Sequence, residues 1–221
     1  MTRIHKRGSL GFVKRLLGVL LVLSMVFPVV NAALTCDSGD KSSKCYVNST
    51  QTLSGNETVS VSDLVLQSSA SLQNVTARTN ISINASTLTM RTGAVIRYGN
   101  VSVDATNVTV ESGATLNTTA LGFTNNNGPG GADSTGNILT PGSGAGYGGD
   151  GYGYNDNGGA SYGAIRKADE LGSGGGDDRA AVGGYGGGPI DIDASRANLS
   201  GSLAAAGGGG EHADYDYEVR G

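Results

Sequence analysis

Apolar and polar residues alternate along the chain from Tyr46 to Ala120. The pattern is clearest in Val101-Ser102-Val103 and Val108-Thr109-Val110, where single polar residues separate β-branched ones. Because successive side chains of a strand point to opposite faces, this period of two predicts strands with one buried face. No helical period of comparable length occurs there, so this half is expected to be all-β. The residues expected to point inward are Val101, Val103, Val108, Val110 and Leu116, with Ser102, Asp104 and Thr109 outward.

The predicted strands recur at a regular interval. Three similar tetrads begin at Ser69, Gly93 and Gly113, and their alanines lie 24 and then 20 residues apart. This spacing fits one coil of a solenoid, in which a single coil buries little and stacking supplies the core. A β-sandwich is the alternative, because it also contains short strands at intervals of about 8 to 12 residues.

Glycine dominates the rest of the chain, where residues 125–221 contain 29 of the 38 glycines. Runs such as 172–176 and 183–188 have the composition of flexible linkers. Alternation nevertheless returns in 190–194 and 198–206. We therefore expect the glycine runs to be loops that leave a continuing β scaffold.

Several glycine motifs follow one another in the order GPGG (128–131), GAGYGG (144–149), GGASYG (158–163), GSGGG (172–176), GGYGGG (183–188) and, after a strand, GGGG (207–210). This order resembles the glycine-rich segment of large parallel β-helix, adhesin-like surface proteins. The resemblance covers roughly residues 55–210, and it implies that glycines fill tight corners and long loops beside a right-handed helix. Such proteins are usually much longer, which implies that this chain is a fragment. The predicted fold is all-β, a right-handed parallel β-helix or solenoid with glycine-rich loops, with a β-sandwich as the alternative.

The N-terminus is basic and then apolar. Five of the 15 Lys and Arg residues lie in 1–15, which contain no acidic residue, and 16–30 form an apolar stretch of 15 residues. This stretch is shorter than the roughly 20 residues that cross a bilayer, and Val30-Asn31-Ala32 fits a cleavage site. We predict a signal peptide over 1–32, with an uncleaved anchor as the alternative. The mature protein is then secreted or at the cell surface, with no membrane span.

Removal of the signal peptide would leave 10 basic residues (15 less 5) against 19 acidic ones, a net charge of −9. This charge makes nucleic acid and anionic membranes poor partners.

The only two cysteines of the chain, Cys36 and Cys45, lie close together near the start of the mature protein. An exported chain meets an oxidising compartment, so we predict one disulfide rather than two free thiols. The expected organisation is a signal peptide (1–32), an N-terminal cap with the disulfide (33–55), a Ser/Thr/Asn-rich β-repeat (56–124) and a glycine-rich continuation of the scaffold (125–221), truncated if the resemblance holds.

Nine asparagines begin the N-x-[Ser/Thr] pattern of N-glycosylation acceptors. Between 46 and 120 all eight asparagines do so, although Ser and Thr fill only 24 of those 75 positions. The alternative is a turn role for Asn, with alternation placing Ser or Thr two residues later. We predict a glycoprotein with acceptors at Asn48, Asn56, Asn74, Asn80, Asn84, Asn100, Asn107, Asn117 and Asn198.

Candidate catalytic residues are sparse. A hydrolase or lyase would need clustered carboxylates beside Arg or Lys, and the nearest set is Asp104 and Glu111 with Arg91 and Arg97. These four are expected at ordinary outward positions of strands. His212, the only histidine after the signal peptide, has no nucleophile or metal motif around it. We therefore predict no catalytic site and no cofactor.

Calcium binding is also not predicted. Two glycine motifs approach the calcium nonapeptide repeat, but Gly153 and Gly188 occupy the position where the repeat has aspartate. The other aspartates of this half are expected in solvated loops rather than on a metal. They are Asp150, Asp156, Asp177, Asp178, Asp191 and Asp193.

Tyrosines punctuate the glycine runs at positions 147, 152, 154, 162 and 185. Rigid aromatic side chains make good contact groups, so they either bind sugars and proteins or pack the loops onto the scaffold. The sequence thus predicts a structural or adhesive protein, not an enzyme, whose partners are surface glycans or other surface proteins. The alternative function is a β-helical lyase or hydrolase that acts on polysaccharide.

Overall fold

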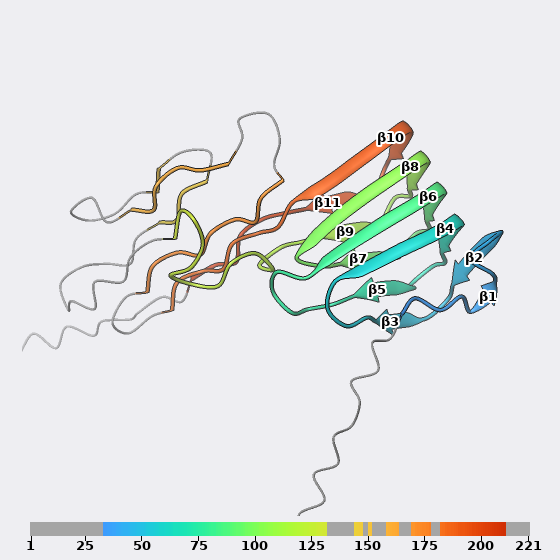
Figure 1. Cartoon of the computed structure of the whole chain (residues 1–221), viewed down its shortest axis with the longest axis horizontal. Coiled ribbons are helices and arrows are strands. Elements are labelled where there is room, and N and C mark those ends of the chain that lie inside the picture. The colour runs from blue at the N-terminus through green and yellow to red at the C-terminus, as the bar shows by residue number, and fades with distance from the viewer. Residues whose placement is uncertain are drawn as a thin grey trace, which may run out of the picture. The chain divides into compact units, whose positions relative to one another are not determined.

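The computed structural model describes residues 33–131, 144–147, 150–151, 158–163, 169–177 and 182–210, which all lie in one compact unit. The predicted signal peptide over 1–32 lies outside these ranges. Every regular element within them is a β-strand (Figure 1). In the same ranges, no helix is long and apolar enough to cross a membrane.

In the described part of the chain, eleven strands form two sheets. The larger sheet has the order β1-β2-β4-β6-β8-β10 and the smaller has the order β11-β9-β7-β5-β3. The strands are β1 (Ser38–Gly39), β2 (Lys44–Val47), β3 (Thr50–Thr52), β4 (Glu57–Leu66), β5 (Ser71–Gln73), β6 (Asn80–Met90), β7 (Val95–Arg97), β8 (Asn100–Val110), β9 (Thr115–Asn117), β10 (Ile190–Leu199) and β11 (Ser202–Ala204).

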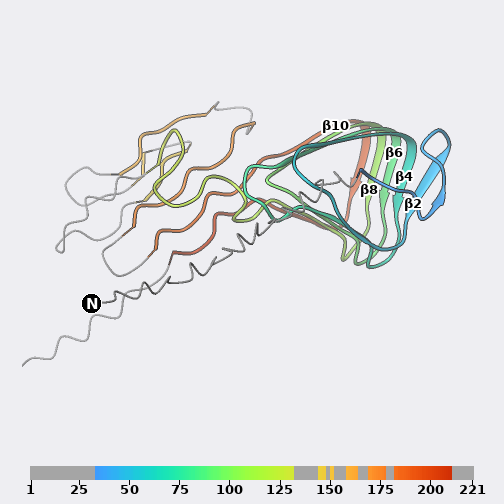
Figure 2. The same ribbon diagram turned by 60° about the horizontal axis from the view of Figure 1, so that its bottom comes forward.

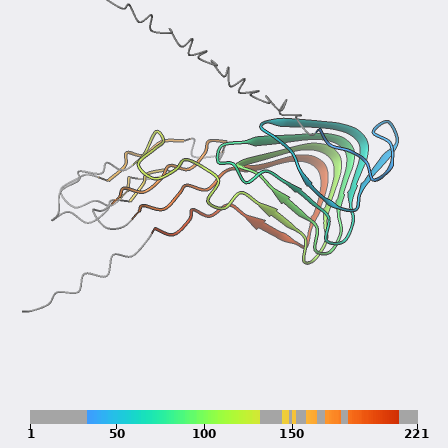
Figure 3. The same ribbon diagram turned by 90° about the horizontal axis from the view of Figure 1, so that it is seen from below.

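From β2 onward the chain alternates between the sheets, so each circuit adds one strand to the larger sheet and one to the smaller. Figure 3 shows these circuits lying one on another. In β6 and β8 the register pairs Ile81 with Val101 and Leu88 with Val108. Apolar residues of successive circuits therefore stack directly, and polar residues stack on polar ones.

The architecture expected from the sequence is wrong. A right-handed parallel β-helix would be parallel throughout, whereas the larger sheet is mixed, because β1 runs antiparallel to β2. The alternative of a β-sandwich fails as well, because the remaining strand pairs of both sheets are parallel. Alternation determines which face of a strand is buried, but it carries no information on the direction of the partner strand.

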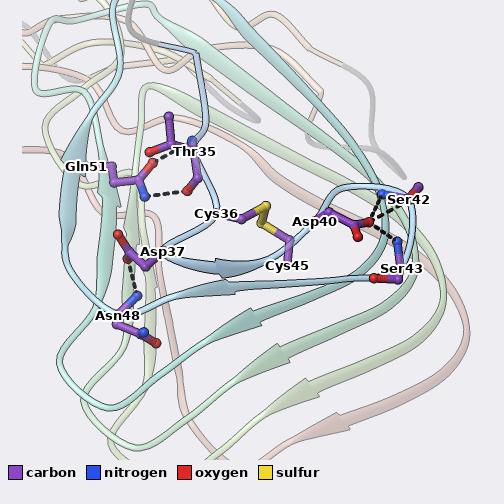
Figure 4. The surroundings of a disulfide bond; sticks show 9 residues. All are labelled: Thr35, Cys36, Asp37, Asp40, Ser42, Ser43, Cys45, Asn48 and Gln51. Carbon is purple, nitrogen blue, oxygen red and sulfur yellow. Dashed lines mark hydrogen bonds between the residues drawn. A yellow bond between two sulfur atoms is a disulfide. The ribbon is translucent and has the colours of Figure 1, made fainter.

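A disulfide-closed turn produces the antiparallel pair (Figure 4). Cys36 and Cys45 are bonded as predicted, with their Cα atoms 5.1 Å apart. The Asp40 carboxylate accepts the N–H groups of Ser42 and Ser43 at 2.9 and 2.8 Å and closes the turn between β1 and β2. Leu34, before the turn, is 2% exposed, so this segment covers the first end of the core.

The core lies between the sheets and confirms the predicted facing of the strands. Val101, Val103, Val108, Val110 and Leu116 are each at most 1% exposed. Asp104 is exposed, whereas Ser102 and Thr109 are half-buried because strands lie on both sides of them. Residues 56–120 contain strands and no helix, as expected.

The long strands bend once (Figure 3). At the bend the register skips one residue in each strand, namely Ser62, Ser86, Thr106 and Ser195. In β8, alternation places Val103 and Ala105 inward before the bend and Val108 and Val110 inward after it. The inward positions therefore change from odd to even numbers across the bend, which the period of two alone did not predict.

Candidate functional site: the glycine block and its tyrosines

Between β9 and β10, and again after β11, the chain forms extended glycine-rich segments that carry no strand among the described residues. We call the described residues 121–131, 144–147, 158–163, 171–177, 182–189 and 205–210 the glycine block. Its segments run beside one another next to the sheets (Figure 1, Figure 2). The described parts of these runs contain no strand, and their segments are hydrogen-bonded to one another.

Backbone hydrogen bonds join the segments of the glycine block across large separations in sequence. Gly122 N–H donates to Gly186 O at 2.8 Å, and Gly172 N–H donates to Gly187 O at 2.8 Å. In another part of the block, Gly159 N–H donates to the carbonyl oxygen of residue 144 at 3.0 Å. These bonds satisfy backbone groups that packing removes from water, which is the requirement that β-sheets meet with ladders.

Glycine is required here because the segments pack backbone against backbone. A Cβ atom added to Gly122, Gly159 or Gly186 would approach a backbone atom of another segment closer than 3.0 Å. Real Cβ atoms essentially never come that close. Glycine is therefore required at these positions by the packing of the segments. The linker-like composition does not indicate a flexible linker there.

The glycine block is attached to the sheets by further hydrogen bonds. Gly188 N–H donates to Thr118 O at 3.0 Å, and the Thr118 hydroxyl donates to Gly188 O at 2.6 Å. Arg78 N–H donates to Leu121 O at 2.8 Å on the same side. Thr118 is completely buried, so its hydrogen bonds to Gly188 are shielded from solvent.

The tyrosines of the block divide into two roles. Tyr162 packs inside the block, where its hydroxyl donates to Leu171 O at 2.6 Å and its ring meets Tyr147 edge to face at 5.0 Å. Burial raises the pKa of the Tyr162 hydroxyl. Tyr185, in contrast, is 41% exposed, and its carbonyl accepts Gly208 N–H at 2.7 Å. Tyr152 and Tyr154 lie outside the described residues.

Asp177 joins three parts of the block. Its carboxylate accepts Gly183 N–H at 2.7 Å and the side-chain amide of Asn125 at 2.8 Å, and it also accepts the amide of Asn126. Asp177 N–H donates in return to Asn126 Oδ1 at 2.8 Å. The Gly183 bond first, and then the two amides, hold the pKa of Asp177 below its ordinary value of 3.8. This role was not predicted from the sequence, although the run of asparagines at 125–127 was a visible signal.

The residues considered for catalysis do not converge on one site. Arg91 and Glu111 form an ion pair at 2.9 Å, and both side chains reach solvent. Asp104 lies in the middle of β8, in register with Asn84 and Asp193 of the neighbouring strands. His212 lies outside the described residues, and within the described ranges no three Asp, Glu, His or Cys side chains gather as metal ligands would.

The described aspartates that were considered for calcium lie in three different places, and no three of them gather. Asp150 accepts Ser161 N–H at 2.6 Å, Asp177 forms the contacts described above, and Asp191 and Asp193 lie in β10. Asp156 and Asp178 fall outside the described ranges.

The nine acceptor asparagines differ in exposure. Asn48, Asn56, Asn80, Asn84 and Asn198 are exposed, and Asn100, Asn107 and Asn117 are half-buried. Asn74 is only 5% exposed, and both ends of its amide are engaged. Its Oδ1 accepts Thr76 N–H at 2.9 Å, and its Nδ2 donates to Gly55 O at 3.4 Å. Asn74 therefore differs from the exposed acceptors, although all nine asparagines have the same motif in the sequence.

Three acceptors also stack along the larger sheet. Asn80 pairs with Asn100 in register, and Asn80 N–H donates to Asn56 Oδ1 at 3.0 Å. Neighbouring strands lie about 4.8 Å apart, so groups attached to adjacent asparagines of this column would occupy the same space outside the sheet.

Comparison of the chain with protein-family models, with curated proteins and with solved structures finds no match.

We predict that Gly186→Ala destabilises the protein by about 1 to 3 kcal/mol, because the added methyl group collides with the backbone at Gly172. Gly209→Ala is the matched control, because nothing lies within 4 Å of its Cβ position. That variant is expected to change stability by less than about 1 kcal/mol. Denaturant unfolding of both variants checks the prediction, and equal stabilities would contradict backbone-to-backbone packing.

Asp177 is expected to make stability depend on pH. Because its folded-state pKa is lowered, its contribution is fully present above the ordinary value of 3.8 and is lost as the pH falls through the lowered pKa. Asp177→Asn should therefore be less stable than the parent protein at pH 7, and the difference should shrink well below pH 4. Thermal melting of both proteins across this range measures it, and a difference independent of pH would contradict the assignment.

Proposed function

We propose that this chain is an exported structural and adhesive protein whose glycine block displays a recognition surface. The observation that carries the proposal is the backbone packing of the block onto the sheets, together with the exposure of Tyr185 on it. A rigid base lowers the entropy cost of binding, and an aromatic ring supplies contact area with few rotatable bonds.

Two observations support export. The Cys36–Cys45 disulfide indicates an oxidising environment. The basic and then apolar segment over 1–32 fits a signal peptide, from which we infer that the protein is secreted or held at the cell surface.

The proposed ligand of the glycine block is a neutral surface glycan. Tyr185 lies between Gly184 and Gly186, so neither of its neighbours in the sequence has a side chain that could cover the ring. Aromatic rings bind the C–H faces of sugars through their apolar, electron-rich faces. The net charge of −9 expected for the mature chain disfavours acidic polymers.

N-glycosylation of the exposed asparagines is part of the proposal. A glycan needs a solvent-facing asparagine, and glycans along an exposed sheet would hinder unwanted strand pairing. Asn80 and Asn100 pair in adjacent strands, so we infer that only one of the two carries a glycan.

We predict that the protein, produced in a host that performs N-glycosylation, has an intact mass above that of the bare polypeptide. Asn84→Gln should lower this mass by one glycan, because Asn84 is exposed. Asn74→Gln is the control and should leave the number of glycans unchanged, because Asn74 is 5% exposed and its amide is engaged. A bare mass, or a glycan on Asn74, would contradict the proposed pattern.

We predict that Tyr185→Ala weakens binding to neutral glycans on a carbohydrate array by about tenfold or more, the usual effect of removing an aromatic contact residue. Val75→Ala is the control, because Val75 is 58% exposed but lies outside the glycine block. Binding that is equal in the two variants would exclude Tyr185 as the contact residue. Release of reducing ends from a polysaccharide would instead favour the lyase or hydrolase alternative.

A further inference from the structure

The first long strand of the larger sheet begins with a charged residue at an inward position. Glu57 of β4 pairs in register with Ile81, and Ile81 pairs with Val101 in the next circuit. Ile81 is 1% exposed and Val101 is completely buried, so this column points into the core. Glu57 is half-buried, and it is the only charged member of the column, which ends at Ile190 of β10.

The carboxylate of Glu57 has little to compensate its charge. Taking a carboxylate from water is costly unless hydrogen bonds and an opposite charge offset the loss. Among the described residues, Glu57 accepts one hydrogen bond, from Leu34 N–H at 3.5 Å, and forms no ion pair with a Lys or Arg side chain. The buried Tyr98 hydroxyl, which has no described partner, senses the same charge, because burial first and then Glu57 raise the pKa of Tyr98.

The segment that donates to this carboxylate is anchored at three consecutive residues. Leu34 is 2% exposed, and Thr35 exchanges two hydrogen bonds with the side chain of Gln51, at 3.0 and 2.6 Å (Figure 4). Cys36 is held by the disulfide. Ala33, immediately before these three residues, is therefore kept close to the carboxylate.

Removal of the predicted signal peptide would change the charge of Ala33. In the uncleaved chain its nitrogen belongs to a peptide bond and is neutral. Hydrolysis of the bond after Ala32 consumes one water, leaves the new carboxylate on the signal peptide, and leaves an α-amino group on Ala33 that is mostly protonated at pH 7. Three bonds of about 1.3 to 1.5 Å join this nitrogen to Leu34 N, so the two nitrogens lie within about 4 Å of each other. Rotation of the terminal residue then brings the ammonium group to Glu57, whose carboxylate contacts Leu34 N–H.

We propose that the α-ammonium group of Ala33, the N-terminus of the mature chain, forms an ion pair with Glu57 and stabilises residues 33–36 over the core. Processing supplies the positive charge that the described side chains do not provide. The inference rests on the export proposed above, because only removal of 1–32 frees this amine. The precursor lacks the charge, so its first end is less stable than that of the mature protein.

A double-mutant cycle tests the ion pair. The chain from residue 33 is produced with its disulfide, once with a free amine on Ala33 and once acetylated there, each with Glu57 and with Glu57→Gln. Acetylation should lower the folded-to-unfolded ratio of the parent by about threefold or more, a typical size for a solvent-accessible ion pair. In Glu57→Gln it should change nothing, because the partner charge is gone. Equal effects in both backgrounds, measured by denaturant unfolding, would overturn the proposal and leave Glu57 only as the acceptor of Leu34 N–H.

The matched control is Asp63→Asn, because Asp63 lies in the same strand beyond the bend and in register with Lys44. Acetylation should destabilise this variant as much as it destabilises the parent. The reactivity of the amine gives a second measurement. An acylating reagent at pH 7 should modify Ala33 about threefold more slowly in the parent than in Glu57→Gln, because an ion pair keeps the amine protonated. Peptide mass mapping measures both rates, and equal rates would contradict the pairing.

N-terminal sequencing of the protein from a host that exports it tests the processing step separately. The secreted chain should begin at Ala33. A secreted chain that begins elsewhere would overturn this inference and leave the export intact, whereas a chain that is not exported would overturn both.

Discussion

The structure depends on satisfying backbone hydrogen bonds between segments that are far apart in sequence. In the sheets this is achieved by parallel ladders, which set like residues of successive circuits on one another. In the glycine block it is achieved without strands, by bonds such as that from Gly172 to Gly187. The sheets and the glycine block meet the same requirement, since any backbone group removed from water needs a hydrogen-bond partner. They differ because side chains fill the space between the sheets, whereas the glycine segments leave no room for a Cβ atom.

The two halves are joined through buried contacts. Thr118 follows the last strand before the block and binds Gly188, the residue that leads back toward β10. The chain therefore leaves the larger part of the sheets after β9 and returns to them before β10 at neighbouring, hydrogen-bonded positions. These hydrogen bonds attach the block that carries Tyr185 to the sheets, as the proposed recognition role of Tyr185 requires.

The ends of the stacked strands have opposite characters. The disulfide and the turn at Asp40 reverse the chain and cover the first end, so that Cys45 itself is fully buried in the core. At the last circuit the apolar pattern continues into β10 and β11 although no described strand follows them.

By itself the sequence determined the strands, their inward faces and the disulfide, because these follow from local alternation and from the proximity of two cysteines. Val101 and Val108 are buried where the period of two placed them. The sequence did not determine the direction of strand pairing or the bend at Thr106, because a period of two is the same for parallel and antiparallel partners. It also did not separate Asn74 from the other acceptors or join Asp177 to Asn125, because these contacts are made between residues distant along the chain. Only the tertiary structure showed that the glycine runs are packed segments, since the absence of a side chain permits both free motion and the closest backbone contact.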